Sequence, residues 1–222
     1  MNVSEAIENR KSVRKFLDRE VERSTIEAIL NTARWAASGS NTQPWQVDVL
    51  TGQKKADLGA KISAAFEAGE KGKMDYHYYP VDWEDPFKAR RVACGMALYA
   101  ALGIEREDRD RRKSQWMANY RAFDAPVMRL FFMDGIMETG SYLDFGMFIQ
   151  SIMLTAMDYG LATCPQASLG EYPWIVKPFL DRDDSDVLMC GMALGYEDTA
   201  DPVNNYRTAR EEVASFTRFI SE

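Results

Sequence analysis

The chain has 222 residues, of which 46% are hydrophobic and 27% charged, a composition typical of globular proteins and unlike that of disordered or fibrous chains. Its length predicts a single domain over residues 1–222. Twenty-seven Lys and Arg against 34 Asp and Glu give a net charge of −7, which disfavours nucleic acid as a partner because an acidic surface repels a polyanion.

The cysteines and the N-terminus favour a cytoplasmic protein. Cys94, Cys164 and Cys190 form no CxxC pair, so neither a disulfide framework nor a zinc site is expected. The first residues lack the basic stretch and apolar run of a secretion signal. Residues 143–161 are the most apolar stretch, but two aspartates and a glutamine within it predict a buried helix and no membrane partner.

The first elements in chain order are a helix, a turn and a strand. A capping-box pattern at Ser24–Glu27 and apolar residues at helical spacing predict a helix over residues 24–37. Turn-forming residues at 38–44 end it. The sequence around residues 47–50 then predicts a strand, which ends at Gly52.

Residues 53–67 are expected to be helical again. The next segment, 68–87, combines glycines and prolines with five aromatic residues and indicates an ordered excursion or lid. Helical spacing returns over 87–102, and the strongly charged residues 105–121 predict a solvent-facing helix. Residues 68–121 as a whole are therefore a possible lid on the substrate side.

The second half predicts two apolar strands around one long helix. Residues 127–133 and 187–194 have the composition of strands, and the first is expected to be central. Residues 142–159 predict a long helix, for which Gly160 is a suitable C-terminal residue. With the polar tail at 196–222, this pattern favours an α+β domain with one sheet covered by helices.

Familiar catalytic patterns are scarce in this chain. It has one histidine, His77, which we interpret as a loop or packing residue. Neither GxGxxG nor GxxxxGK[ST] occurs, so the usual phosphate-binding loops are absent. If the protein is an enzyme, its chemistry is expected to come from a cofactor, without a metal site.

Two basic groups lie near opposite ends of the chain. The first contains Arg10, Lys11, Ser12, Arg14 and Lys15, and the second contains Arg207 and Arg210. Arginine pairs of this kind suit a phosphate, to which they can donate charge-assisted hydrogen bonds. The alternatives are a solvated basic face for the first group and, for the second, the start of a surface helix paired with nearby glutamates.

Two loops carry groups that a ligand could use. Residues 38–45 offer hydroxyl and amide groups that can hydrogen-bond a flat heterocycle or a polyol, although they could equally be a simple connector. Residues 163–170 are mostly small, which would let backbone N–H groups approach a ligand closely.

Five short motifs occur in order along nearly the whole chain: Arg10-x-Ser12-x-Arg14, Ser38-x-x-Asn41-x-Gln43-Pro44-Trp45, Asp124-Ala125-Pro126-Val127, Gly160-Leu161-x-x-Cys164-Pro165-Gln166-Ala167 and Arg207-x-x-Arg210. In this order and spacing they resemble the nitroreductase-like family of FMN-dependent oxidoreductases. Each motif is weak alone, whereas the set is specific.

The resemblance implies an α+β fold with a single mixed or antiparallel sheet covered by helices, in an intertwined homodimer with FMN at the subunit interface. It implies an FMN-dependent NAD(P)H oxidoreductase that reduces nitroaromatics, quinones or similar electron-poor acceptors by a ping-pong scheme. Flavin N5 carries the hydride, so no catalytic side chain is expected. The alternatives are reduction of activated alkenes, reductive dehalogenation, or a non-catalytic FMN carrier or sensor.

The resemblance also implies which residues hold FMN. The phosphate would be bound by Arg10, Arg207 and Arg210, with Ser12 and Lys11 nearby, and Arg14 would face the ribityl chain or the pyrimidine edge. The flavin or ribityl contacts from the partner subunit would be Ser38, Gly39, Asn41 and Gln43. The residues over the ring, with a backbone N–H toward N5, would be Pro165, Gln166 and Ala167.

The substrate side is less well defined. Trp116, Tyr120 and Phe123, with the aromatic residues of 76–87, could form a roof over the substrate or belong to the core. The loop at 166–168 reads Gln-Ala-Ser where the best-studied branch of the family has an acidic residue followed by glycine. This difference leaves the acceptor open.

Overall fold

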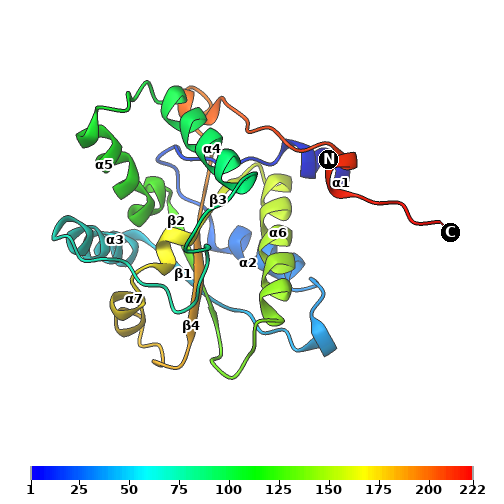
Figure 1. Cartoon of the computed structure of the whole chain (residues 1–222). Coiled ribbons are helices and arrows are strands. Elements are labelled where there is room, and N and C mark those ends of the chain that lie inside the picture. The colour runs from blue at the N-terminus through cyan, green and yellow to red at the C-terminus, as the bar shows by residue number, and fades with distance from the viewer. Residues whose placement is uncertain (1, 222) are drawn as a thin grey trace.

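In the computed structural model, which describes residues 2–221, four antiparallel strands form one sheet in the order β1-β2-β4-β3 (Figure 1). The strands are β1 (Gln46–Thr51), β2 (Val127–Met133), β3 (Ala162–Gln166) and β4 (Val187–Gly195). The helices are α1 (Val3–Asn9), α2 (Arg23–Ala33), α3 (Gly52–Glu67), α4 (Phe87–Ala101), α5 (Arg109–Met117), α6 (Ser141–Asp158), α7 (Pro173–Phe179) and α8 (Val213–Phe216). The expected α+β fold with one sheet covered by helices is confirmed.

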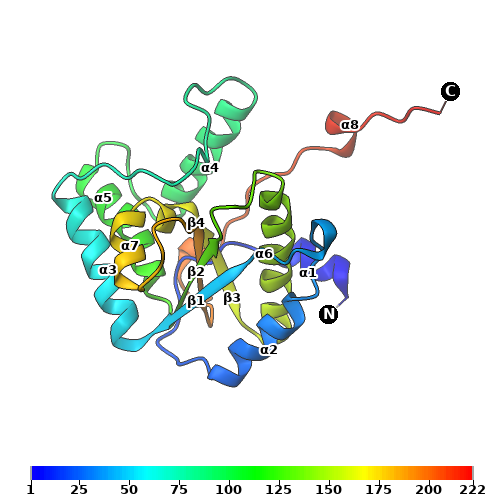
Figure 2. The same cartoon turned by 90° about the horizontal axis from the view of Figure 1, so that it is seen from below.

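Helices cover both faces of the sheet, as Figure 2 shows. On one face α2 and α6 pack together, and on the other lie α3, α7 and the 3₁₀ segment η2 (Ala118–Asp124). Strand β2 alternates between the two apolar clusters, with Phe131 on the α6 side and Leu130 and Phe132 on the α3 side. All seven residues of β2 are buried, which confirms that it is a central strand.

The long helix α6 forms as the apolar spacing predicts. Phe145, Phe148, Ile152 and Ala156 recur at helical intervals and are buried against the sheet. Gly160 follows with φ of +67°, the left-handed conformation that glycine adopts easily at a helix end. Among the described residues, no helix is both long and apolar enough to cross a membrane.

The first predicted helix is shorter than expected, and its capping box is wrong. Helix α2 begins at Arg23 after Glu22, with no side-chain cap, and ends at Ala33 rather than at residue 37. Glu27 does not reach back to the backbone because its carboxylate accepts a hydrogen bond from Arg23 Nε at 2.7 Å.

Strand β3 overlaps residues 163–170, for which the sequence indicated a loop of small residues. It is short and contains Pro165, and β4 is the only strand with which it pairs among the described residues, apart from a single bridge to Ser12. Because a proline cannot donate to a ladder, it is tolerated at such a sheet edge and hides the strand from sequence patterns.

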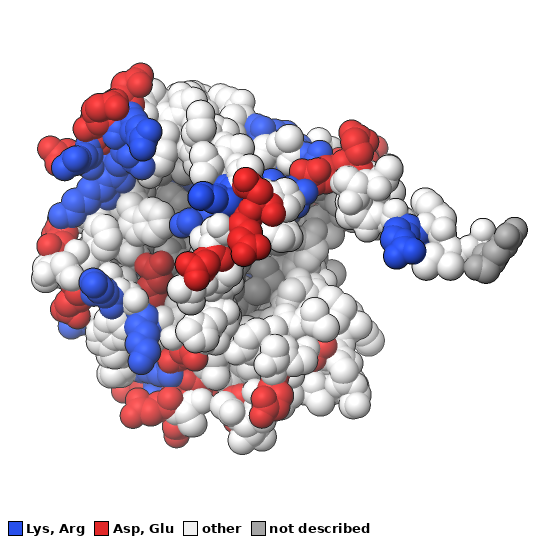
Figure 3. All heavy atoms as spheres, in the orientation of Figure 1, with Lys and Arg blue, Asp and Glu red and all other residues white. Residues whose placement is uncertain are grey.

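The charged helix is also shorter than predicted. Helix α5 begins at Arg109, capped by Asp108, and ends at Met117, after which the chain turns into η2. It buries no residue, as a solvent-facing helix should, and Figure 3 shows its basic side chains gathered at the upper left. The excursion at 68–86 contains no helix or strand, and α4 stands away from the body (Figure 2).

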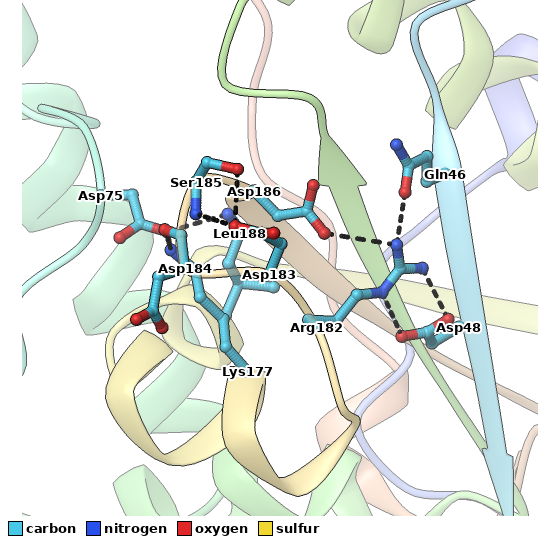
Figure 4. A network of polar contacts seen from close by, with 10 residues as sticks. All are labelled: Gln46, Asp48, Asp75, Lys177, Arg182, Asp183, Asp184, Ser185, Asp186 and Leu188. Carbon is cyan, nitrogen blue, oxygen red and sulfur yellow. Dashed lines mark hydrogen bonds and ion pairs between the residues drawn. The ribbon is translucent and has the colours of Figure 1, made fainter.

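A polar network ties the loop after α7 to the sheet (Figure 4). Arg182 donates to both carboxylate oxygens of Asp48 on β1, at 2.9 and 2.7 Å. Beside it, Lys177 Nζ lies 3.0 Å from Asp75 Oδ2, with side-chain exposures of 9% and 20%, and donates to Asp184 O at 3.1 Å. Asp75 also accepts a hydrogen bond from Leu188 N at 2.9 Å, so this pair fixes the start of the aromatic excursion to β4.

We expect Lys177→Ala to lower the free energy of unfolding by about 3 kcal/mol, because it leaves the carboxylate of Asp75 largely buried without its cation. For a domain of this size, that is a fall of roughly 6–12 °C in Tm. Thermal unfolding checks the value. Arg23→Ala is the control, because its pair with Glu27 has side-chain exposures of 92% and 60% and contributes little. Equal losses in the two variants would contradict the assignment.

Candidate functional site

The two basic groups of the sequence meet in one cavity of about 130 Å³. Its lining residues are Arg10, Lys11, Ser12, Arg14, Cys94, Tyr206, Arg207, Thr208 and Arg210. Nearly two hundred residues of chain separate the two groups. The fold therefore brings together the five residues predicted around a phosphate, and it places Arg14 beside them.

Hydrogen bonds to the edge strand hold the first basic group in place. Ser12 forms an isolated bridge with Thr163 on β3, and Val13 N donates to Thr163 O at 3.0 Å. Arg14 N donates to Asn204 Oδ1 at 2.9 Å, so the buried Asn204 joins the first group to the C-terminal segment.

Repulsion between cations makes this cavity suited to an anion. Lys11 is neutralised by Glu197, with Nζ and Oε1 2.6 Å apart. Arg10, by contrast, has no carboxylate partner among the described residues, and its pKa is lowered by burial and by the charges of Arg210 and Arg207. A bound anion would relieve this repulsion, because opposite charge favours the protonated guanidinium.

Residues 38–43 form a tight turn with exposed side chains. Ser38 Oγ accepts a hydrogen bond from Gln43 N at 3.0 Å, and Gly39 N donates to Asp144 Oδ1 at 3.1 Å. Asn41 and Gln43 have left-handed φ angles of 57° and 49° and are exposed. The turn therefore exposes the side chains of Asn41 and Gln43 to solvent, although Gln43 Nε2 also donates to Asn41 O at 3.2 Å.

At the end of β3, Pro165, Gln166 and Ala167 lead into the 3₁₀ segment η3 (Ala167–Gly170). The amide of Gln166 is buried, and its Nε2 donates to Asn119 O at 2.8 Å. Its Oε1 has no hydrogen-bond partner within the described part of the chain. A buried acceptor without a partner is costly, so a donor supplied by a ligand would fit here.

Two of the three predicted roof residues belong to the core instead. Tyr120 and Phe123 are 1% and 4% exposed and pack in the apolar cluster between η2 and the sheet. Left-handed Ala122 and Phe123 turn η2 inward, which sequence spacing could not indicate. Of the two alternatives for Tyr120 and Phe123, a substrate roof or the core, the structure favours the core, whereas Trp116 is 44% exposed.

Sequence reasoning missed three residues of the cavity. Tyr206 Oη accepts a hydrogen bond from Arg14 Nη1 at 3.1 Å, and Thr208 Oγ1 accepts one from Arg210 Nη1 at 2.8 Å. Both are neighbours of Arg207 in the sequence, so their proximity to the predicted arginines could have indicated that they belong to the site. Cys94 comes from α4, and no pattern in the sequence connected it with the basic residues.

Comparisons with known proteins agree on one family. The Nitroreductase family model matches residues 7–196. The chain is 37% identical to a 4-nitrobenzoate reductase of Pseudomonas putida over 96% of this chain and 93% of the relative. The chain belongs to the nitroreductase family. Another family member, nitroreductase NfnB of Mycolicibacterium smegmatis, is 34% identical over 96% of this chain and 90% of the relative.

Solved nitroreductase structures share the whole fold. The FMN and NADPH-dependent nitroreductase NfnB from sphigopyxis sp. strain HMH superposes with a TM-score of 0.97 at 37% identity, covering 100% of both chains. The FMN-dependent NfnB from Mycobacterium smegmatis, in complex with NADPH, gives a TM-score of 0.93 at 32% identity, covering 98% of this chain and 97% of that one. The nitroreductase-like fold is thus confirmed.

Within one nitroreductase chain, the predicted cofactor residues form two separate groups. The turn at 38–43 contacts Asp144 in the first turn of α6, whereas Ser12 pairs with Thr163, beyond the other end of that helix. Eighteen residues of helix measure about 27 Å. The two groups therefore lie toward opposite ends of α6.

Proposed function

We propose that this nitroreductase is an FMN-dependent NAD(P)H oxidoreductase that reduces nitroaromatic compounds and similar electron-poor acceptors. The observation that carries the proposal is the cationic cavity around Arg10, whose arginines have no carboxylate partner among the described residues. Terminal monophosphates are the kind of anion that clustered arginines bind. The FMN dependence of the similar solved nitroreductases supports the same cofactor here.

Arg10, Arg207 and Arg210 would hold the FMN phosphate, and Ser12 would add a hydroxyl donor. Lys11 would contribute less, because Glu197 already neutralises it. Arg14, oriented by Tyr206, would place a positive charge beside the ribityl chain or the pyrimidine edge. The residues proposed over the ring are Pro165, Gln166 and Ala167.

When bound, FMN would supply the hydride chemistry, by accepting a hydride from NAD(P)H and passing it to the acceptor. The protein's own residues would bind and orient. A cation at the pyrimidine edge favours the reduced cofactor, because negative charge accumulates there on reduction. The chain would act as one domain, with residues 68–121 on the substrate side.

We propose that the cofactor site is shared by two copies of the chain. The separation of the two residue groups along α6 is one reason. The exposed apolar surface is another, because α6 leaves Leu143 75% exposed, and the C-terminal tail leaves Phe216, Phe219 and Ile220 70%, 89% and 76% exposed. In Figures 1 and 2 this tail reaches away from the body.

A groove of about 880 Å³ would receive the tail of the second copy. It lies between α2 and β1, with an apolar floor that includes Ile26, Val47 and Val127 and a rim that includes several acidic residues. Strand β1 is an edge strand, paired only with β2 among the described residues, so its outer backbone groups are free to bind an extended segment.

Removing residues 213–222 should therefore convert the dimer to a monomer and reduce its FMN content. Burying three large apolar side chains contributes on the order of 5 kcal/mol to association. Analytical ultracentrifugation, with the full chain as control, measures the change. A truncated chain that remained fully dimeric would contradict this role for the tail.

We propose that the protein is located in the cytoplasm. Its three free cysteines support this proposal, because thiols stay reduced in that compartment.

Steady-state kinetics test the proposed function. With NAD(P)H and a nitroaromatic acceptor both varied, double-reciprocal plots should give parallel lines, because one flavin face must serve both substrates in turn. Intersecting lines would contradict the use of one flavin face by both substrates in turn. If the protein bound FMN but turned over no acceptor, the result would favour the alternative of a non-catalytic FMN carrier or sensor.

A further inference from the structure

The aromatic excursion packs beside an arginine of α4 that has no counter-ion among the described residues, and the base of the excursion is attached to the sheet. Tyr76 Oη donates to Met189 O at 2.6 Å, next to the Asp75–Lys177 pair. From this base the rings continue outward, with Tyr78 and Tyr79 at 4.5 Å between centroids and Tyr79 and Trp83 at 5.5 Å. These rings form an exposed aromatic wall beside α4 rather than a disordered loop.

Arg91 of α4 lies on this wall. Its guanidinium carbon is 4.8 Å from the centroid of Trp83 and 6.0 Å from that of Tyr79. Within residues 2–221, Arg91 has no ion pair or side-chain hydrogen bond, whereas the adjacent Arg90 pairs with Glu211 at 2.9 Å. All hydrogen-bond donors of Arg91 are therefore available to a ligand.

The position of Arg91 relates it to the cationic cavity. Cys94, which lines that cavity, follows three residues later and thus lies on the same side of α4. The aromatic excursion also contacts the segment after β3, because Lys73 N donates to Glu171 O at 2.7 Å. The pKa of Tyr79 is raised mainly by burial, and the nearby charge of Arg91 lowers it. The aromatic wall is therefore connected to the cationic cavity through α4 and to the end of β3 through Glu171.

We propose that Arg91 binds the carboxylate of an anionic nitroaromatic acceptor, such as a nitrobenzoate, while Tyr79 and Trp83 pack against its electron-poor ring. A guanidinium held beside aromatic rings loses less side-chain entropy when it binds a carboxylate than a freely moving one. Electron-rich rings stack favourably on electron-poor ones. This inference rests on the proposed function and narrows it to acceptors that carry a negative charge.

The test compares 4-nitrobenzoate with its methyl ester, which has the same ring and nitro group but no charge. Arg91→Gln should lower kcat/KM for 4-nitrobenzoate roughly 10- to 100-fold, mainly through KM, and change that for the ester less than about 2-fold. Arg91→Lys should restore part of the loss, since it keeps the charge. Arg109→Gln, an equal charge change on the exposed start of α5, should leave both substrates unaffected.

Three other results are informative. Equal losses for the acid and the ester would show that Arg91 only supports the aromatic wall, which overturns the proposal. Unchanged kinetics in Arg91→Gln would overturn it too. If the wild-type protein bound FMN but reduced neither compound with NAD(P)H, the proposed function itself would be wrong. This result is distinguishable from a failure of the Arg91 proposal, because it is seen in the wild-type protein and needs no variant.

Discussion

Replacing Arg10 and Arg210 together with alanine should weaken FMN binding by roughly two to three orders of magnitude. Both arginines line the same small cavity, and a charge-assisted hydrogen bond to a phosphate contributes about 1.5–3 kcal/mol. Fluorescence titration of the apoprotein with FMN measures the change. Because Arg10 and Arg210 repel each other without a ligand, the apoprotein should not lose thermal stability.

Riboflavin provides the matched control, because it lacks only the phosphate. Its affinity should be nearly the same in wild type and in the double variant, and Arg109→Ala should bind both ligands normally. A double variant that lost FMN and riboflavin affinity to the same extent would contradict the assignment of these arginines to the phosphate.

The second large effect is expected in a mixed dimer, with Asn41→Ala in one chain and Arg10→Ala in the other. If each FMN is held by Arg10 of one chain and Asn41 of the other, one site collects both substitutions and the other site none. Half of the FMN should then bind with normal affinity. The separation of the two groups along α6 is the physical reason to expect this result.

Titration of purified mixed dimer with FMN distinguishes the two arrangements. The controls are the Asn41→Ala homodimer and the Arg10→Ala homodimer, in which both sites carry a substitution. Two sites that were weakened to intermediate extents would mean that a single chain serves each FMN. The shared site would then have to be given up.

Local patterns predicted the elements that build the scaffold. Strand β2 is apolar except for Arg129, and α6 has a regular apolar spacing that ends at Gly160. The positions of both elements therefore follow from the sequence within a residue or two. The predicted strands at 47–50 and 187–194 correspond to β1 and β4 in the same way. In each case side-chain periodicity and a clear stop signal agree.

Features that depend on distant contacts were harder to predict. The capping box predicted for α2 does not form because Glu27 is paired with Arg23, and the helix ends at Ala33 instead of at residue 37. Tyr120 and Phe123 are aromatic residues of the kind that could cover a substrate, but the turn of η2 directs their side chains into the core. The roles of Cys94 and Arg91 depend on where α4 lies relative to the N-terminal segment, which no local pattern encodes.

The most direct test of the proposed function is an anaerobic titration of the purified protein, followed by its flavin absorbance. We expect a yellow protein that releases FMN on denaturation, is bleached by one equivalent of NADH or NADPH per site, and recovers its colour when a nitroaromatic is added. Recovery should match the amount of acceptor reduced. A protein that stayed colourless with added FMN, or whose bound FMN was not bleached by either nicotinamide, would contradict the account.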